Sequence, residues 1–207
     1  MTTAYIDHVL VGVPDLEAGI GAMEGLMGVR PVLGGEHPHW GTHNALLSLG
    51  DGIYFELIAV RPGAEAPKFE HLRSLSAPTP IGWAVRVDDP REVSSLLRGA
   101  GLAPTDTKPG SRQTPAGAVL RWETFDLDPA PAGSPFFIHW LPETAHPSKT
   151  SPSGCSLSRF EIASPDAAEL VRLRDALGLR LDIREAETPR MTLTLRCPKG
   201  TVTLPAT

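Results

Sequence analysis

The sequence predicts an α+β fold built from repeated βαβββ modules, two of which pair into one cupped mixed sheet with helices outside. Two observations predict this fold. A strand-like apolar run followed by a helical stretch occurs at three evenly spaced places, and short strand candidates follow each helix. We expect modules at residues 1–65 and 78–143, which together form one domain over 1–143. A third βαβββ-like module is expected at 155–207, with a structural or oligomerising role.

The first module begins with an apolar run at residues 6–13, after which Asp15 marks the start of a helix. The apolar positions of this helix recur at helical spacing, at Leu16, Ile20, Met23 and Met27. Its three glycines make it a poor intrinsic helix, so we expect packing to hold it. Strand candidates complete the module at residues 31–33, 45–49 and 53–60.

The second and third copies repeat this order. In the second, a strand at 81–88 precedes a helix that starts at Asp89-Pro90 and ends at Gly101. Its later strand candidates are residues 103–108, 118–125 and 136–141. In the third, residues 157–166 align with 6–15, and a helix then precedes strands at 191–196 and 201–204. An unpaired module exposes a sheet edge, which favours a homodimer through the third module of a second chain.

Composition excludes several classes of function. The 207 residues are 41% hydrophobic and 21% charged, as in ordinary soluble domains. A net charge of −5 without a long basic run argues against nucleic acid as a partner. We expect no membrane association, because no apolar run reaches about 20 residues, and the N-terminus has no secretory pattern. The two cysteines, Cys155 and Cys197, are too few for a disulfide framework and form no C-x-x-C pair, so a cytoplasmic location is expected.

Titratable residues interrupt apolar strands at related positions of the repeat. His8 lies in the first strand, and Glu56 lies in the last strand of the same module, where an unpaired carboxylate would be costly. His139 is placed at the corresponding position of the second module. If these three side chains converge on the concave face of the sheet, they supply two imidazoles and a carboxylate. This ligand set suits Fe(II), and Zn, Mn, Ni or Co can also use it. The alternative for each histidine is a satisfied core residue.

A loop of the first module and one of the second offer possible substrate contacts. His39, Trp40 and His43 could line the mouth of the cup, or they are incidental residues of a surface loop. A zinc site from His37, His39 and His43 matches no standard ligand spacing. Arg112, expected in a loop of the second module, either binds a substrate carboxylate or phosphate or is solvated.

The opening strand around His8, residues 35–46, Tyr54-Phe55-Glu56-Leu57 and residues 135–140 resemble glyoxalase-like domains of the vicinal oxygen chelate superfamily, over residues 5–142. The resemblance implies paired modules whose sheet holds a divalent metal on the first and last strands of each module. His8, Glu56 and His139 then fall on ligand positions, and the remaining position falls on Gly82, which has no side chain. The candidate substrate contacts are His39, Trp40, His43, Asn44, Tyr54 and Arg112.

We therefore expect a metal-dependent enzyme, with Fe, Mn, Zn or Ni, that acts on a small metabolite carrying two vicinal oxygens. The resemblance implies either lyase or isomerase chemistry or a dioxygenase reaction, and the residues do not choose between these. The alternative is a metal-free protein that binds or sequesters a small hydrophobic molecule in the same cup. Glu56 would then pair with His8 or His139 as a buried ion pair.

Overall fold

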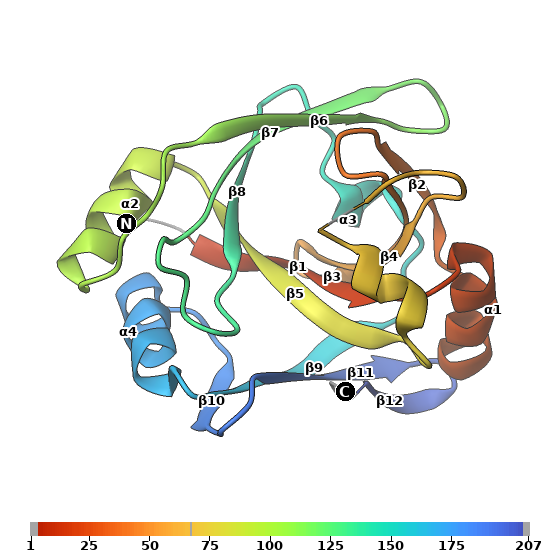
Figure 1. The fold of residues 1–207 in the computed structure, drawn as a ribbon. Helices are drawn as coiled ribbons and strands as arrows, with labels where there is room; N and C mark the ends of the chain where they lie inside the picture. The colour runs from red at the N-terminus through yellow and green to blue at the C-terminus, as the bar shows by residue number, and fades with distance from the viewer. Residues whose placement is uncertain (1–3, 67, 205–207) are drawn as a thin grey trace.

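A computed structural model of the chain describes residues 4–66 and 68–204. The first module consists of β1 (Ala4–Gly12), α1 (Leu16–Met27), β2 (Val32–His37), β3 (Thr42–Gly50) and β4 (Ile53–Val60), and its four strands form the first half of the main sheet. A short 3-10 helix, η1 (Glu70–Ser74), follows. The second module consists of β5 (Thr79–Val87), α2 (Pro90–Gly99), β6 (Lys108–Gln113), β7 (Val119–Phe125) and β8 (Phe136–Trp140), and its four strands form the second half of the sheet. Together these strands form one eight-stranded sheet in the order β2-β3-β4-β1-β5-β8-β7-β6 (Figure 1).

The two halves of this sheet have the same topology and meet in its middle. β1 pairs antiparallel with β5, and in each half the first strand pairs parallel with the last, β1 with β4 and β5 with β8. The predicted fold of paired βαβββ modules in one cupped mixed sheet is confirmed. Curvature brings the edge strands β2 and β6 together, so that a Cβ on Gly35, whose φ is 145°, would collide with the Gln113 carbonyl oxygen.

α1 shows how packing holds a glycine-rich helix. The Asp15 side chain accepts a hydrogen bond from the Ala18 backbone N–H at 2.8 Å, and Gly28 ends the helix with a φ of 78°. The four predicted apolar residues are buried. A Cβ on Gly19 would lie 2.8 Å from a Val13 methyl carbon, so a glycine here lets the helix approach the end of β1 closely.

The strand predicted at 103–108 is wrong. The structure has β6 at Lys108–Gln113, a polar edge strand that the β-branched pattern does not reveal. It is a strand because it pairs antiparallel with β7, with Arg112 opposite Leu120. Arg112 therefore lies in a strand, and not in the loop that the sequence predicted.

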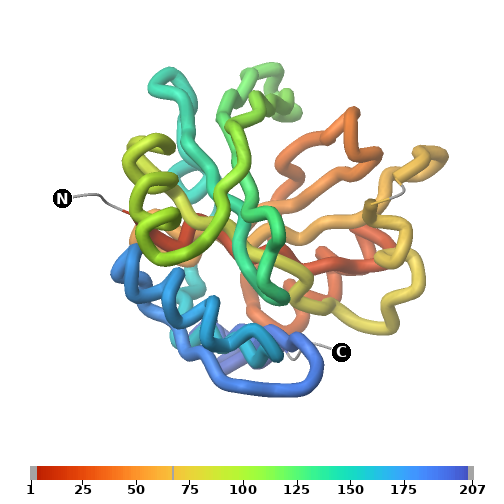
Figure 2. The backbone as a smooth tube through the Cα atoms, turned by 60° about the vertical axis from the view of Figure 1, so that its left-hand side comes forward, coloured from red at the N-terminus to blue at the C-terminus, as the bar shows by residue number. Residues whose placement is uncertain are grey.

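The chain continues through α3 (Pro147–Thr150) into a second unit, with β9 (Ser156–Ser164), α4 (Ala167–Leu177), β10 (Asp182–Glu185), β11 (Arg190–Cys197) and β12 (Gly200–Leu204). Its four strands form a sheet in the order β10-β9-β11-β12 that lies against the outer face of the first sheet (Figures 1 and 2). Trp83 of β5 and Phe160 of β9 meet edge to face, with ring centroids 5.4 Å apart. One buried apolar core contains residues of both sheets and of α1, α2 and α4.

The third module keeps the element order of the first but pairs its strands differently. β9 pairs parallel with β10, the strand directly after its helix, whereas β1 pairs parallel with β4. Because its apolar face packs on the first sheet, that face is covered within the chain. The homodimer remains a prediction, because β10 and β12 still end this sheet as edge strands.

Cys155 and Cys197 form a disulfide that the sequence analysis did not expect. The two cysteines are 42 residues apart, and they meet because β9 and β11 pair with Ser156 opposite Arg196. The cytoplasmic location, which was inferred in part from the absence of cysteine pairs, remains a prediction. Among the residues described, no helix is long and apolar enough to cross a membrane.

Candidate functional site

The floor of the cup is built around a β-bulge in β1. In the pairing of β1 with β5, Ile6 lies opposite Val85 and His8 lies opposite Ala84, so Asp7 is an extra residue without a partner in β5. Ile6 and Val9 remain in the outer core beneath the helices. Asp7 and His8, which alternation would send to opposite faces, therefore both belong to one network on the inner face.

Asp7 is the centre of this network. His8 Nδ1 lies 2.6 Å from Oδ1, while His146 Nε2 and Trp140 Nε1 lie 2.9 and 3.1 Å from Oδ2. Burial acts to raise the pKa of Asp7, but the hydrogen bonds of His146 and His8 outweigh it and lower the pKa to about 2. The carboxylate is thus ionised and accepts all three bonds, so both imidazoles and the indole donate to it.

His8 points from Asp7 towards Glu56. With Nδ1 held by Asp7, Nε2 lies 3.6 Å from Glu56 Oε2, and Asn44 Nδ2 donates to Glu56 Oε1 at 2.9 Å. Tyr54 stacks on the His8 ring at 4.5 Å, and burial raises the pKa of its hydroxyl well above the usual value. The structure therefore brings together four predicted site residues in a buried polar network.

His139 does not join this network. Phe136, Ile138 and Trp140 face the inside of the cup, whereas Phe137 lies in the outer core, so alternation puts His139 on the outer face. Its Nδ1 donates to the Val87 carbonyl oxygen at 3.0 Å. The sequence overlay that matched His139 to Glu56 carries no information on strand register, and the structure does not bring the two residues together.

The register identifies which residue of β8 corresponds to Glu56. In the pairing of β1 with β5, His8 lies opposite Ala84 and Leu10 lies opposite Gly82. This pairing relates the two strands by a two-fold symmetry if Gly82 corresponds to His8 and Ala84 corresponds to Leu10. Leu10 of β1 lies opposite Glu56 of β4. Ala84 of β5, which corresponds to Leu10, lies opposite Phe136 of β8. Phe136 therefore occupies in the second half the position that Glu56 occupies in the first. The implied metal positions thus contain His8 and Glu56, but also a glycine and a phenylalanine.

The residues present do not fit a metal ion held by three or more side chains. Within residues 4–66 and 68–204, no group of at least three His, Cys, Asp or Glu residues could hold one. His8 and Glu56 supply only one imidazole and one carboxylate, fewer donors than protein metal sites commonly use.

The turn between β2 and β3 carries predicted contacts that the structure does not bring to the floor. His39 and Trp40 are exposed, and Trp40 packs towards His37 with ring centroids 5.3 Å apart. His43 is half-buried, and alternation along β3 points it away from the face of Asn44. Burial lowers the pKa of His37 and of His43, which favours their neutral forms. His37, His39 and His43 form no metal-binding group among the described residues.

His146 is a site residue that the sequence analysis missed. It lies in the linker between the second and third modules, just before α3, and α3 packs against β3. The Ser48 backbone N–H donates to the Pro152 carbonyl oxygen at 2.7 Å, which fixes the end of this segment. The linker thus folds back over the cup and places an imidazole on Asp7. No local sequence pattern predicts this contact.

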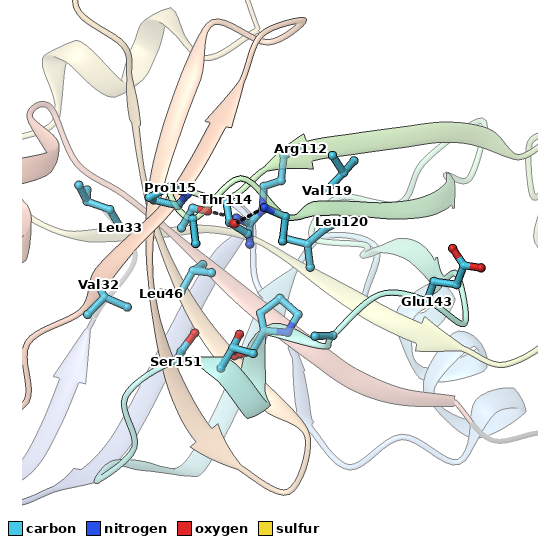
Figure 3. Close-up of a pocket in the computed structure, with 16 residues that line it drawn as sticks. Val32, Leu33, Leu46, Arg112, Thr114, Pro115, Val119, Leu120, Glu143 and Ser151 are labelled. Atoms are coloured by element: carbon cyan, nitrogen blue, oxygen red, sulfur yellow. Dashed lines mark hydrogen bonds between the residues drawn. The ribbon is translucent and has the colours of Figure 1, made fainter.

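A cavity of about 470 Å³ lies beside this floor, between β2, β6, β7 and the segment around α3 (Figure 3). Leu46, the cross-strand neighbour of Glu56, forms part of its wall, so the cavity adjoins the polar network. Most of its lining is apolar, notably Val32, Leu33, Leu46, Pro115, Val119 and Leu120. The charged residues of the lining are Arg112 and Glu143, which lie on different sides of the cavity (Figure 3).

Comparison with known proteins agrees with this architecture. A family model described as a glyoxalase-like domain matches residues 6–178. The chain belongs to the glyoxalase-like domain family. The resemblance to glyoxalase-like domains is thereby confirmed, and the match continues beyond the first two modules into α4. No curated protein matches this glyoxalase-like chain.

Solved structures match the chain at low sequence identity. A hypothetical protein from Staphylococcus aureus is 16% identical, with a TM-score of 0.63 over 98% of this chain and 85% of that one. Methylmalonyl-CoA epimerase from Mycobacterium tuberculosis is 23% identical, with a TM-score of 0.47 over 65% of this chain and 85% of that one. The Streptomyces coelicolor epimerase in complex with 2-nitronate-propionyl-CoA is 16% identical, with a TM-score of 0.46 over 67% and 98%. The first match extends across both sheets.

Proposed function

We propose that this glyoxalase-like protein binds a small, largely apolar organic molecule in its cup, without a metal ion held by its side chains. The register between β5 and β8 carries the proposal, because it gives Phe136 the position that Glu56 has in the first module. Since Gly82 also offers no ligand, the floor supplies only His8 and Glu56 as donors. Their 3.6 Å approach corresponds to the buried pair of the metal-free alternative.

The cavity supports binding of this kind. Its volume of about 470 Å³ falls within the range of roughly 300–1,000 Å³ that is typical of small-molecule sites. Such sites are mostly apolar with a few polar groups, and the lining here has that composition. The metal-dependent isomerase and dioxygenase chemistries would need a ligand set that these side chains do not supply.

The contact between Asp7 and His8 favours a second candidate, a metal-independent lyase or isomerase. Because Nδ1 donates to Asp7, the lone pair of the neutral His8 ring is on Nε2, which can accept a proton from a substrate carbon. Asp7 would stabilise the imidazolium that forms, and the imidazolium would return the proton from Nε2 to a neighbouring substrate atom, so that the protein ends the step as it began it. His8 is only 3% exposed, so a substrate reaches Nε2 only if neighbouring side chains move.

Metal content and binding of a neutral probe test the first proposal. After dialysis against Fe(II), Mn(II), Ni(II) or Zn(II), we expect far less than one ion per chain, and the same for Glu56→Gln. N-phenyl-1-naphthylamine should bind at one site, and Leu46→Trp, which fills the cavity, should weaken that binding at least tenfold. Leu96→Trp is the control, because Leu96 lies on α2 and is 39% exposed. One metal per chain that Glu56→Gln loses, or equal probe binding by all variants, would contradict the proposal.

Deuterium uptake tests the second candidate. In D2O, the protein would catalyse exchange of a carbon-bound proton in small ketones or 2-oxo acids, and His8→Gln would abolish the exchange while retaining probe binding. Probe binding without exchange in any such compound favours the binding function alone.

A further inference from the structure

Arg112 is a buried cation that the fold leaves without an acidic partner. Its side chain crosses from β6 to β2, where Nη1 donates to the Gly34 carbonyl oxygen, and the residue is only 5% exposed. Among the described residues, Arg112 forms no ion pair with a carboxylate within 4.0 Å, and its side chain donates to the Gly34 carbonyl oxygen. Arginine has five N–H donors, so most of its capacity is open.

Such a charge is expensive to bury without a counterion. The polar network of the cup floor does not supply this counterion, because Arg112 forms no hydrogen bond with His8 or Glu56. Arg112 instead lines the 470 Å³ cavity, among mostly apolar side chains (Figure 3). The structure therefore positions a fixed cation at one side of an apolar cavity that is large enough for an organic ligand.

We propose that the ligand of this cavity is an organic monocarboxylate, with its carboxylate on Arg112 and its apolar part against Leu46 and Leu120. The inference rests on the proposed binding function and adds the chemical class of the ligand. A guanidinium recognises a carboxylate through two parallel N–H bonds, and one cation balances one negative charge. Glu143, across the cavity from Arg112 in Figure 3, disfavours a second anionic group at that side.

The apolar rim supports a ligand with a substantial hydrocarbon part. Val32, Leu33 and Val119 line the cavity although they are 42%, 57% and 44% exposed, respectively. These side chains lie on the edge strand β2 and on β7, on both sides of Arg112. A ligand that combines a carboxylate with an aliphatic chain or ring would satisfy the buried cation and cover this rim at once.

Calorimetric titration with octanoate, 1-octanol, octylamine and octyl phosphate tests the proposal on the wild-type protein. We expect octanoate to bind at least about tenfold more tightly than 1-octanol, as one charge-assisted contact commonly provides. Octylamine should bind most weakly. If 1-octanol binds as tightly as octanoate, or octyl phosphate binds more tightly, the carboxylate assignment is overturned while cup binding stands. If none of the four binds, the proposed binding function itself fails.

Variants assign the effect to Arg112. Arg112→Gln should remove the preference for octanoate over 1-octanol, and Arg112→Lys, which keeps the charge, should retain part of it. Arg121→Gln is the matched control, because Arg121 is exposed on the paired strand β7, opposite Ser111. If Arg112→Gln does not fold, the Lys variant and the wild-type series still decide. A preference that is unchanged in both Arg112 variants would overturn the assignment.

Discussion

Replacing Asp7 with asparagine tests the centre of the buried network. The wild-type carboxylate accepts bonds from His8, His146 and Trp140. An amide of the same size has one oxygen and one NH2 group, so at least one of these donors would face another donor. We expect Asp7→Asn to lower the free energy of unfolding, because a buried group that loses its partner keeps the full cost of its desolvation.

The pKa of Asp7 sets the magnitude. Burial acts to raise this pKa, and the bonds of His146 and His8 bring it from 3.8 down to about 2. A shift of nearly two pKa units corresponds to about 2 kcal/mol of stability. Because the folded-state pKa is below the unfolded value, this stability is fully present above about pH 5 and is lost as the pH falls towards 2. Roughly half of it is gone at about pH 3.

Urea unfolding at pH 7 and pH 3, followed by tryptophan fluorescence, measures both effects. Asp7→Asn should be less stable than wild type by about 2 kcal/mol or more at pH 7, and the difference should shrink by about 1 kcal/mol at pH 3. Asp126→Asn is the control, because that carboxylate is exposed, and it should match wild type at both pH values. Equal stability of Asp7→Asn and wild type at pH 7, or a difference that does not change with pH, would refute the reasoning.

Four further changes test separate parts of the fold. Gly35→Ala should destabilise the protein by about 1–3 kcal/mol in thermal unfolding, because it strains a residue with a φ of 145° and forces β2 from β6. Gly21→Ala, on α1 with open space around it, should instead be neutral or stabilising. Phe136→His should create a Zn(II) site with His8 and Glu56 that calorimetry detects and that wild type lacks. Dithiothreitol should lower the melting temperature, since the disulfide closes a loop of about 40 residues worth roughly 3–4 kcal/mol.

The repeat made the fold predictable from sequence. Apolar periodicity and the strand–helix order identify elements that form locally, and the pairing of two modules follows from the need to cover edges and apolar faces. β6 was misplaced because its residues are polar, and only its pairing with β7 makes it a strand. The disulfide was not predicted because it joins cysteines that are distant in sequence.

The candidate site was predictable only where strand alternation holds. His8 and Glu56 were selected as titratable residues on apolar strands, and Asn44 and Tyr54 were implied by the family resemblance; the structure brings the four together. A period of two cannot reveal the bulge that adds Asp7 to the same network, because a bulge is defined by the partner strand. For the same reason, an overlay of sequences could not fix the register of β8. His146 arrives through a tertiary contact of a linker, which no local pattern encodes.

The distribution of charge within the cup leads to a last prediction. The floor holds the carboxylates of Asp7 and Glu56. Among the described residues, Arg112 is the only lysine or arginine that is buried, and it lies in the side wall. An anionic ligand is therefore attracted to the side wall and not to the floor. Zinc bound in Phe136→His would add a cation to the floor, where an octanoate carboxylate could then lie. In the zinc-loaded Phe136→His variant, Arg112→Gln should reduce the affinity for octanoate less than it does in the wild-type protein. Calorimetric titration of Arg112→Gln with octanoate, with and without Phe136→His, measures the two losses. An equal loss in the two would mean that the carboxylate stays on Arg112, and that the floor and the cavity are separate compartments.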